Sequence, residues 1–153
     1  MKLKLISTIF ILIILESCGA SKTDLIKERV EKTYLYTQYT ADPNNTDFEI
    51  KQISKTENNN GSEYCLFFKD KANDLVRTKF RTDLKDQNIV VNYYFKNDEL
   101  IYLLYEDKNL DKSYSRYFEN EKVIFDCCKN FQPNEAIISK GINYTKNYKS
   151  ASM

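Results

Sequence analysis

A near-repeat in the second half of the chain constrains its fold more than any other feature. The segments YYFKNDELIYL (93–103) and RYFENEKVIFD (116–126) align residue by residue at an offset of 23. Each copy contains an aromatic stretch, a polar turn around an asparagine, and an aliphatic stretch. Asparagine tolerates the positive φ that tight hairpin turns require. The repeat therefore predicts two antiparallel β-hairpins.

The segment before the repeat extends the same arrangement. FFKDKANDLVRTKF (67–80) is a looser third copy, with three extra residues in its turn. Three successive hairpins give an antiparallel meander of six strands, and Phe48–Thr56 is a candidate for an additional edge strand. The runs Ile89–Val91 and Leu100–Leu104 are apolar at consecutive positions. We therefore expect the middle of the sheet to be covered on both faces, or curled around a helix.

A helix is predicted before the meander, over residues 23–39. Ile26, Val30 and Thr37 recur on one stripe at helical spacing. The segment that follows contains Pro43, which disfavours helix at the residue before it. This helix should therefore pack one side against the sheet.

A second helix is predicted after the meander, over residues 133–149. It would place Ile138, Ile142 and Thr145 on one side. Gly141 and the β-branched residues of this segment are also compatible with a strand. We favour the helix.

These elements together predict the α+β fold class. The expected order is an N-terminal helix, a curved antiparallel β-meander of about six strands, and a C-terminal helix. This arrangement is similar to the cystatin type of α+β fold. The likeness is one of architecture, and such folds host enzymes, inhibitors and carriers alike.

The first residues of the chain are typical of an export signal. Two lysines precede an apolar stretch over residues 5–15, which is about half of the roughly 20 residues needed to span a bilayer. A basic start, a short apolar stretch and small residues after it are typical of a signal peptide. One alternative is therefore a plain signal peptide cleaved near Ala20, which would remove Cys18.

The residues that end this stretch favour a different cleavage. Leu15-Glu16-Ser17-Cys18 has an aliphatic residue at −3, a small residue at −1 and then a cysteine. This motif resembles the lipobox of bacterial lipoproteins. The resemblance implies that residues 1–17 are a lipoprotein signal peptide and that Cys18 becomes the lipidated N-terminus. Residues 18–22 would then be a lipidated tether, and 23–153 a single α+β domain.

The lipobox also implies a location. Several acyl chains on Cys18 would anchor the protein stably to a membrane without spanning it. We therefore expect a protein of the bacterial cell envelope, on the periplasmic or outer-membrane side. Its membrane partner would be bound through the N-terminal lipid anchor.

Charge argues against nucleic acid as a partner. The whole chain has 23 basic and 22 acidic residues, and removing residues 1–17 takes away two lysines and one glutamate. The mature chain is then left with 21 of each and no net charge. No global field would steer it toward a polyanion.

The residues needed for common catalytic chemistry are missing from the sequence. There is no histidine, which removes the usual general base and the usual zinc ligand. There is also no Gly-rich phosphate loop and no Cys-x-x-Cys motif. Glu99, Glu106 and Asp107 could serve carboxylate catalysis, but they lie in or beside polar turns, where solvated charges are the ordinary explanation. We predict a protein without enzymatic activity, cofactor or metal, and keep a carboxylate-dependent enzyme as an alternative.

Three cysteines remain after Cys18. One prediction is a disulfide from Cys65 to Cys127 or Cys128, which an oxidising compartment permits. The alternative is that these cysteines are small buried side chains without a bridge. A bridge between the adjacent Cys127 and Cys128 would need a distorted backbone.

A basic stripe is predicted on one strand. LVRTKFRT (75–82) places Arg77, Lys79 and Arg81 on one face of the strand. Adjacent cations repel one another unless acidic residues or an anionic partner compensate them. The stripe could therefore bind an acidic protein or another anionic component of the envelope. The alternative, which the sequence favours, is a solvated sheet face with Asp or Glu of the next strand opposite.

The aromatic residues also allow two interpretations. Tyrosine and phenylalanine are abundant, 12 and 9 residues in the whole chain, so they should dominate the core. Some tyrosines could instead line a ligand groove. The candidates are Tyr93, Tyr94, Tyr102, Tyr105, Tyr114 and Tyr117.

The sequence thus supports one leading hypothesis and one alternative of another class. The leading hypothesis is a non-enzymatic envelope lipoprotein that binds a protein partner through its sheet, in an inhibitor, immunity or assembly role. The alternative is a carrier that encloses a small apolar ligand between helix and sheet. The carrier hypothesis predicts a continuous cavity of at least ~300 Å³ lined by tyrosines.

Overall fold

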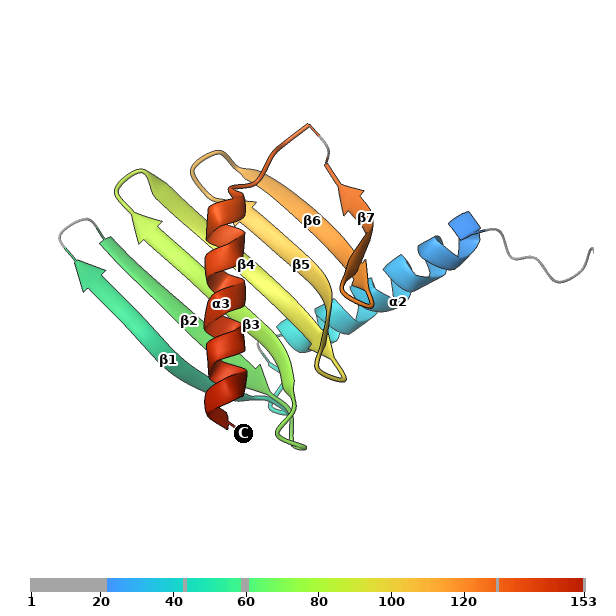
Figure 1. The fold of residues 1–153 in the computed structure, drawn as a ribbon, viewed down its shortest axis with the longest axis horizontal. Coiled ribbons are helices and arrows are strands. Elements are labelled where there is room, and N and C mark those ends of the chain that lie inside the picture. The colour runs from blue at the N-terminus through green and yellow to red at the C-terminus, as the bar shows by residue number, and fades with distance from the viewer. Residues whose placement is uncertain (1–21, 43, 59–60, 129, 153) are drawn as a thin grey trace, which may run out of the picture.

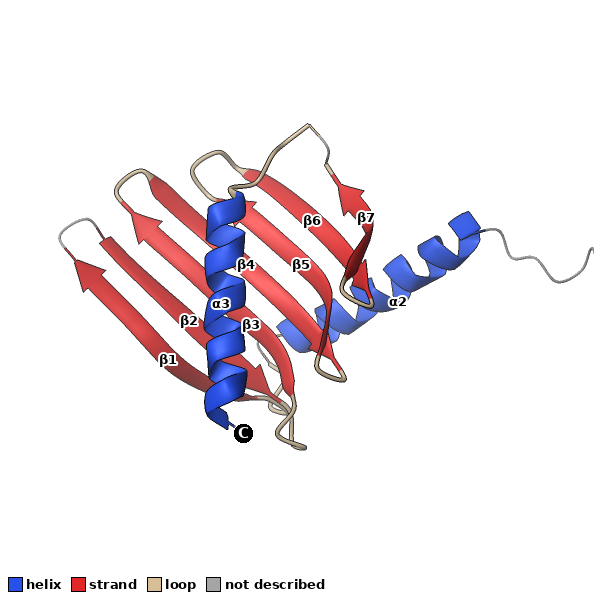
Figure 2. Ribbon diagram, in the orientation of Figure 1, coloured by secondary structure: helices blue, strands red, loops and turns tan. Residues whose placement is uncertain are grey.

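The computed structural model describes residues 22–42, 44–58, 61–128 and 130–152. The predicted signal peptide, Cys18 and the rest of the tether before Lys22 lie outside these residues. In the described part, an antiparallel sheet has one helix on each face (Figure 1 and Figure 2).

The elements follow the predicted order. They are α2 (Lys22–Ala41), β1 (Glu49–Asn58), β2 (Gly61–Lys69), β3 (Leu75–Leu84), β4 (Gln87–Lys96), β5 (Glu99–Asp107), β6 (Lys112–Glu119), β7 (Lys122–Cys127) and α3 (Glu135–Ser152). The order of strands in the sheet is the order in the chain, from β1 to β7. The predicted α+β class with a meander between two helices is confirmed. The sheet has seven strands because the additional edge strand suggested near residues 48–56 is present as β1.

Both copies of the near-repeat form hairpins with the predicted turns. Asn97 and Asp98 have φ of 51° and 65°, and Asn120 and Glu121 have φ of 48° and 63°. Two consecutive residues with positive φ are the feature of the type I′ turn, whose twist matches that of the strands. The sequence repeat is therefore a structural repeat.

The repeat also carries a matching irregularity. A β-bulge interrupts the register between Tyr94 and Phe95 and again between Tyr117 and Phe118, which are equivalent positions in the two copies. Bulges bend a strand and increase its local twist. Repeated bulges at one position of each hairpin account for a curved sheet.

Helix α3 covers one face of the sheet and closes the main core. Asn134 caps its N-terminus, since the Asn134 Oδ1 accepts hydrogen bonds from the backbone N–H groups of Ala136 and Ile137. Rings of α3 stack on rings of the sheet, Tyr148 on Phe67 at 4.2 Å between centroids and Tyr144 on Phe80 at 5.6 Å. The buried core on this face includes Cys65, Phe67, Leu75, Phe80, Ile89, Val91, Tyr93, Leu103, Tyr105, Tyr114, Ile137, Ile138 and Tyr148.

Gly141 allows α3 to approach the sheet closely. A Cβ built at this position would lie 2.7 Å from the Tyr93 ring carbons Cε2 and Cζ, and closer still to its hydroxyl. The same hydroxyl donates a 2.8 Å hydrogen bond to the carbonyl oxygen of Ile138. Glycine is therefore required at this position of the helix because a larger residue would clash with Tyr93. Its presence in the segment does not indicate a strand.

Helix α2 lies on the opposite face and makes a smaller contact. Val30 packs on a second cluster formed by Tyr94, Tyr102 and Tyr117. The Tyr36 hydroxyl donates a 2.7 Å hydrogen bond to the carbonyl oxygen of Phe95. Both faces are thus covered near the middle of the sheet, as the apolar runs predicted. No helix in the described part of the chain is long and apolar enough to cross a membrane.

The tyrosine groove predicted as an alternative is not formed. Tyr93, Tyr105 and Tyr114 belong to the core under α3, whereas Tyr94, Tyr102 and Tyr117 form the cluster under α2. The six side chains divide equally between the two faces of the sheet, and all six are buried. They therefore fill two cores and do not line a common groove.

Candidate binding face

Strand β3 places its three cations on the face that carries α2. Arg77, Lys79 and Arg81 alternate with Thr78 and Phe80, and Phe80 packs against α3 on the other side. Cross-strand neighbours share a face, and Arg77 lies opposite Tyr94, which belongs to the cluster under α2. We call the three cations and their cross-strand neighbours the basic face, which comprises Arg77, Lys79, Arg81, Tyr64, Leu66, Phe68, Val90, Asn92 and Tyr94.

Helix α2 reaches β3 at the start of the basic face only. Tyr36, Tyr39 and Thr40, in the C-terminal turns of α2, line a hollow together with Val76 of β3. From there the helix runs behind the sheet and out past β7 (Figure 1). The part of β3 that carries Lys79 and Arg81 therefore lies beyond the end of α2 and is not covered by that helix (Figure 1).

The neighbours of the three cations differ from those expected for a solvated sheet face. Arg77 lies between Phe68 and Tyr94 in the sheet register. Lys79 lies between Leu66 and Asn92, and Arg81 between Tyr64 and Val90. None of these six positions is acidic. The expectation of Asp or Glu opposite the stripe is therefore wrong.

The two arginines are held by contacts within the face. The Arg77 guanidinium lies over the Phe68 ring, 3.7 Å from its centroid. Arg81 donates a 3.0 Å hydrogen bond to Asp83, and a hydrogen bond to Tyr64 raises the pKa of Arg81. Their head groups are therefore positioned before any partner arrives.

Lys79 is the least compensated charge of the stripe. It has no ion pair or side-chain hydrogen bond within the described residues. It is flanked along β3 by two further cations, at a spacing of roughly 7 Å between alternate residues. Between half-buried charges at this spacing, water and salt leave a repulsion of roughly a few tenths of a kcal/mol per pair. An anionic partner would relieve this repulsion.

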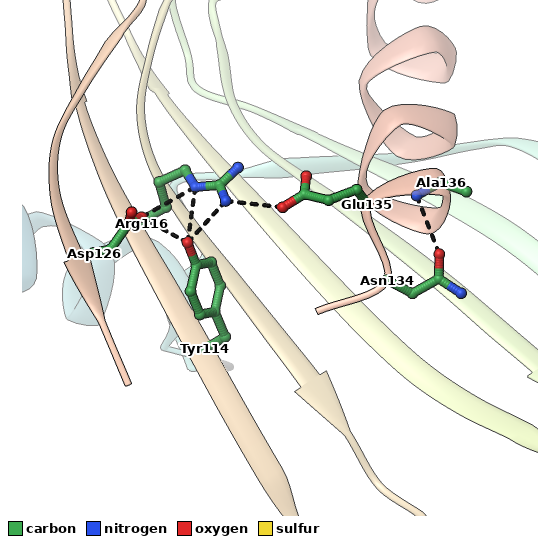
Figure 3. A network of polar contacts seen from close by, with 6 residues as sticks. All are labelled: Tyr114, Arg116, Asp126, Asn134, Glu135 and Ala136. Atoms are coloured by element: carbon green, nitrogen blue, oxygen red, sulfur yellow. Dashed lines mark hydrogen bonds and ion pairs between the residues drawn. The ribbon is translucent and has the colours of Figure 1, made fainter. Parts of the chain in front are cut away.

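A second polar cluster lies on the α3 side, at the edge of the sheet (Figure 3). Arg116 on β6 donates hydrogen bonds to Asp126 on β7, to the Tyr114 hydroxyl, and at 2.9 Å to Glu135 on α3. The Tyr114 hydroxyl in turn donates a 2.6 Å hydrogen bond to Asp126. Partial burial alone would lower the pKa of Arg116, but these hydrogen bonds raise it. The cluster fastens the last hairpin to the first turn of α3.

This cluster does not have the arrangement of a carboxylate active site. Asp126 and Glu135 share the guanidinium of Arg116, and their side chains are 36% and 60% exposed. A catalytic acid needs a desolvated carboxyl group without a neutralising partner. We therefore interpret the cluster as a structural link.

The three carboxylates singled out from the sequence are also accounted for by turn structure. Glu99 is exposed at the start of β5, and Glu106 pairs with Lys108. The Asp107 carboxylate accepts hydrogen bonds from the backbone N–H groups of Asn109 and Leu110. They lie in or beside polar turns, as expected. No group of three or more metal-binding side chains gathers anywhere in the described ranges.

The most apolar hollow described lies at one end of α3. It has a volume of about 410 Å³ and is open to solvent. Its apolar lining comes from Phe95, Leu100, Phe118 and Ile142, with no tyrosine among its lining residues. This hollow differs from the tyrosine-lined cavity that a carrier would need.

The predicted disulfide from Cys65 to Cys127 or Cys128 conflicts with the sheet order. Cys65 lies on β2 and Cys127 ends β7, with four strands between them. Neighbouring strands are about 4.8 Å apart, so the separation of Cys65 from Cys127 is about 24 Å, far beyond disulfide reach. All three cysteines are free. Cys65 fits the alternative, a small buried side chain in the core.

Comparison with protein-family models, curated proteins and solved structures finds no match to this chain. Its functional interpretation therefore depends on the geometry of the basic face and on the N-terminal sequence.

Proposed function

We propose that this chain is a lipid-anchored, non-enzymatic protein of the bacterial envelope that binds an acidic segment of a protein partner on its basic face. The observation that carries the proposal is the stripe of three half-buried cations without a carboxylate opposite. The lipobox resemblance supplies the location. An inhibitor, immunity or assembly role would fit binding through such a surface.

The register of β3 favours an extended partner segment. Arg77, Lys79 and Arg81 recur at every second residue, which is the period of side chains on one side of an extended chain. A partner with Asp or Glu at alternate positions would present carboxylates at the same spacing. The Phe68 ring is buried beneath the Arg77 guanidinium, so it holds the cation in place on the face. We therefore expect an acidic, extended segment rather than a diffuse negative surface.

Charge reversal of the stripe should abolish partner binding. We expect the triple variant Arg77→Glu, Lys79→Glu, Arg81→Glu to lose at least about tenfold in affinity, because three attractive pairs become repulsive. Binding by the parent should also weaken as salt rises. The measurement is quantitative pull-down from detergent-solubilised membranes, with cross-linking from position 79 to identify the bound segment.

The control carries the same charge change on other surfaces. Lys27, Lys85 and Lys122 are exposed on α2, on the β3–β4 turn and on β7. The variant Lys27→Glu, Lys85→Glu, Lys122→Glu should bind the partner as strongly as the parent does. An unchanged partner list in the stripe variant, or a cross-linked segment without alternating acidic residues, would count against the proposal.

The anchor predicts covalent lipid on Cys18. Growth with a palmitate analogue should label the parent chain and leave the variant Cys18→Ala unlabelled. The variant should also appear in the soluble fraction, because several acyl chains are what holds the parent on the membrane. A parent chain without label would contradict the lipoprotein assignment and leave the basic face to be tested separately.

A further inference from the structure

The end of strand β7 brings two thiols together. The Sγ atoms of Cys127 and Cys128 lie 2.7 Å apart. The two residues are adjacent in the chain, and side chains of adjacent residues on a regular strand point to opposite faces. Their approach therefore requires the backbone to leave the strand conformation at this point.

The backbone does leave the strand at Cys128. Its φ is 66°, in the left-handed region. The other non-glycine residues with positive φ in the described chain are Asn, Asp or Glu in hairpin turns, namely Asn73, Asn97, Asp98, Asp111, Asn120 and Glu121. Cys128 instead follows the end of an edge strand, where its carbonyl oxygen accepts a 3.0 Å hydrogen bond from the backbone N–H of Phe131. Its side chain lacks the amide or carboxylate group by which Asn and Asp favour this conformation. Such conformations cost of order 1–3 kcal/mol and cluster where function requires them.

Both thiols can be reached from solvent, and the strand before them is held in place. Cys128 is exposed and Cys127 is half-buried. Asp126, the residue before the pair, is fixed by Arg116 and Tyr114. The hydrogen bond with Cys127 raises the pKa of Cys128, because it stabilises the protonated thiol.

We propose that Cys127 and Cys128 are an oxidisable vicinal dithiol that closes to a disulfide by exchange with a disulfide oxidant. One thiolate attacks a sulfur of the oxidant and releases its first thiol. The second cysteine then attacks the mixed disulfide and releases the second thiol. Two electrons pass to the oxidant, its two sulfurs take up the two protons, and a small ring through the Cys127–Cys128 peptide bond remains. The distortion that argued against this bridge from the sequence is already built into the fold.

The test uses the full chain and oxidised glutathione as the oxidant. The reduced protein is exposed to oxidised glutathione, alkylated with iodoacetamide without reduction, and digested with trypsin. Cleavage after Lys122 and Lys129 releases VIFDCCK, which contains both cysteines and no other. We expect this peptide to be unalkylated and lighter by two hydrogens than the dithiol. A peptide that carries two alkyl groups or two glutathiones would overturn the proposal.

Three variants and one condition separate the pair from other thiols. Cys127→Ser and Cys128→Ser should each leave a single thiol that takes one glutathione or one alkyl group. Cys65→Ala should leave the peptide result unchanged, because Cys65 is fully buried and burial raises the pKa of its thiol to about 12. The folded chain should close the bridge at least about tenfold faster than the chain in concentrated urea, because the fold holds the two sulfurs together. Equal rates of bridge closure in the folded and the urea-unfolded chain would contradict the claim that the fold holds the two sulfurs together.

Discussion

Replacing Gly141 with alanine should destabilise the protein by about 1–3 kcal/mol, the usual cost of an added methyl group in a packed core. Alanine is the better helix former by roughly 1 kcal/mol, so an exposed helical glycine would respond in the opposite direction. The new methyl group would lie 2.7 Å from two carbons of the Tyr93 ring. Neither side can move easily, because Tyr93 is fully buried and its hydroxyl is bonded to α3 itself. The measurement is urea unfolding followed by far-UV circular dichroism.

Two further variants make this result specific to the Tyr93 contact. Asn143→Ala adds no clash because Asn143 is exposed on the same helix, so it should leave stability within about 0.5 kcal/mol. Tyr93→Phe removes the atom closest to the new methyl group. The double variant Gly141→Ala, Tyr93→Phe should therefore lose less stability than the two single variants combined. If Gly141→Ala unfolds at the same or a higher urea concentration than the parent, the close approach of α3 to β4 is wrong.

Replacing Phe80 with alanine should cost about 3–5 kcal/mol, the range for a buried phenylalanine. Phe80 is fully buried and stacks on Tyr144 of α3, so its removal leaves a cavity between sheet and helix. Urea or thermal unfolding measures the loss, which is a large part of an ordinary total stability of about 5–15 kcal/mol.

The preceding residue in the strand, Lys79, provides the matched control. Lys79→Ala changes a side chain on the other face of β3, where no ion pair in the described structure is lost, and should change stability by no more than about 0.5 kcal/mol. Phe125→Ala removes a ring of the same size that is 43% exposed, and should cost much less than Phe80→Ala. Equal losses at positions 79 and 80 would contradict the assignment of the two faces of β3.

The hairpins could be predicted because their determinants are local. The near-repeat encodes both the type I′ turns at Asn97 and Asn120 and the aromatic strands before them. The C-terminal helix was harder, because Gly141 disfavours helix in isolation. A glycine is needed at this position because the ring of Tyr93, which lies 48 residues earlier in the sequence, packs directly against it. No local rule could have paired these two residues.

The candidate site was predicted only in part. Strand alternation placed Arg77, Lys79 and Arg81 on one face, and this is confirmed. Their neighbours depend on the exact register, including the bulge between Phe68 and Lys69, which the sequence does not reveal. The Arg116 cluster was missed because its members come from β6, β7 and α3. The predicted disulfide from Cys65 to Cys127 or Cys128 is wrong because four strands of the meander lie between β2 and β7.

The order of strands has a consequence for how the chain folds. Each strand pairs with the one that precedes it in the chain, so the sheet can grow by adding neighbours without closing long loops. The contacts between residues far apart in the sequence are those that dock α2 and α3 on the sheet. The ion pair of Lys140 on α3 with Glu63 on β2, for example, joins residues 77 apart. Because rates fall as contacts become more distant in sequence, we expect helix docking, rather than strand pairing, to limit the rate at which the native state is reached.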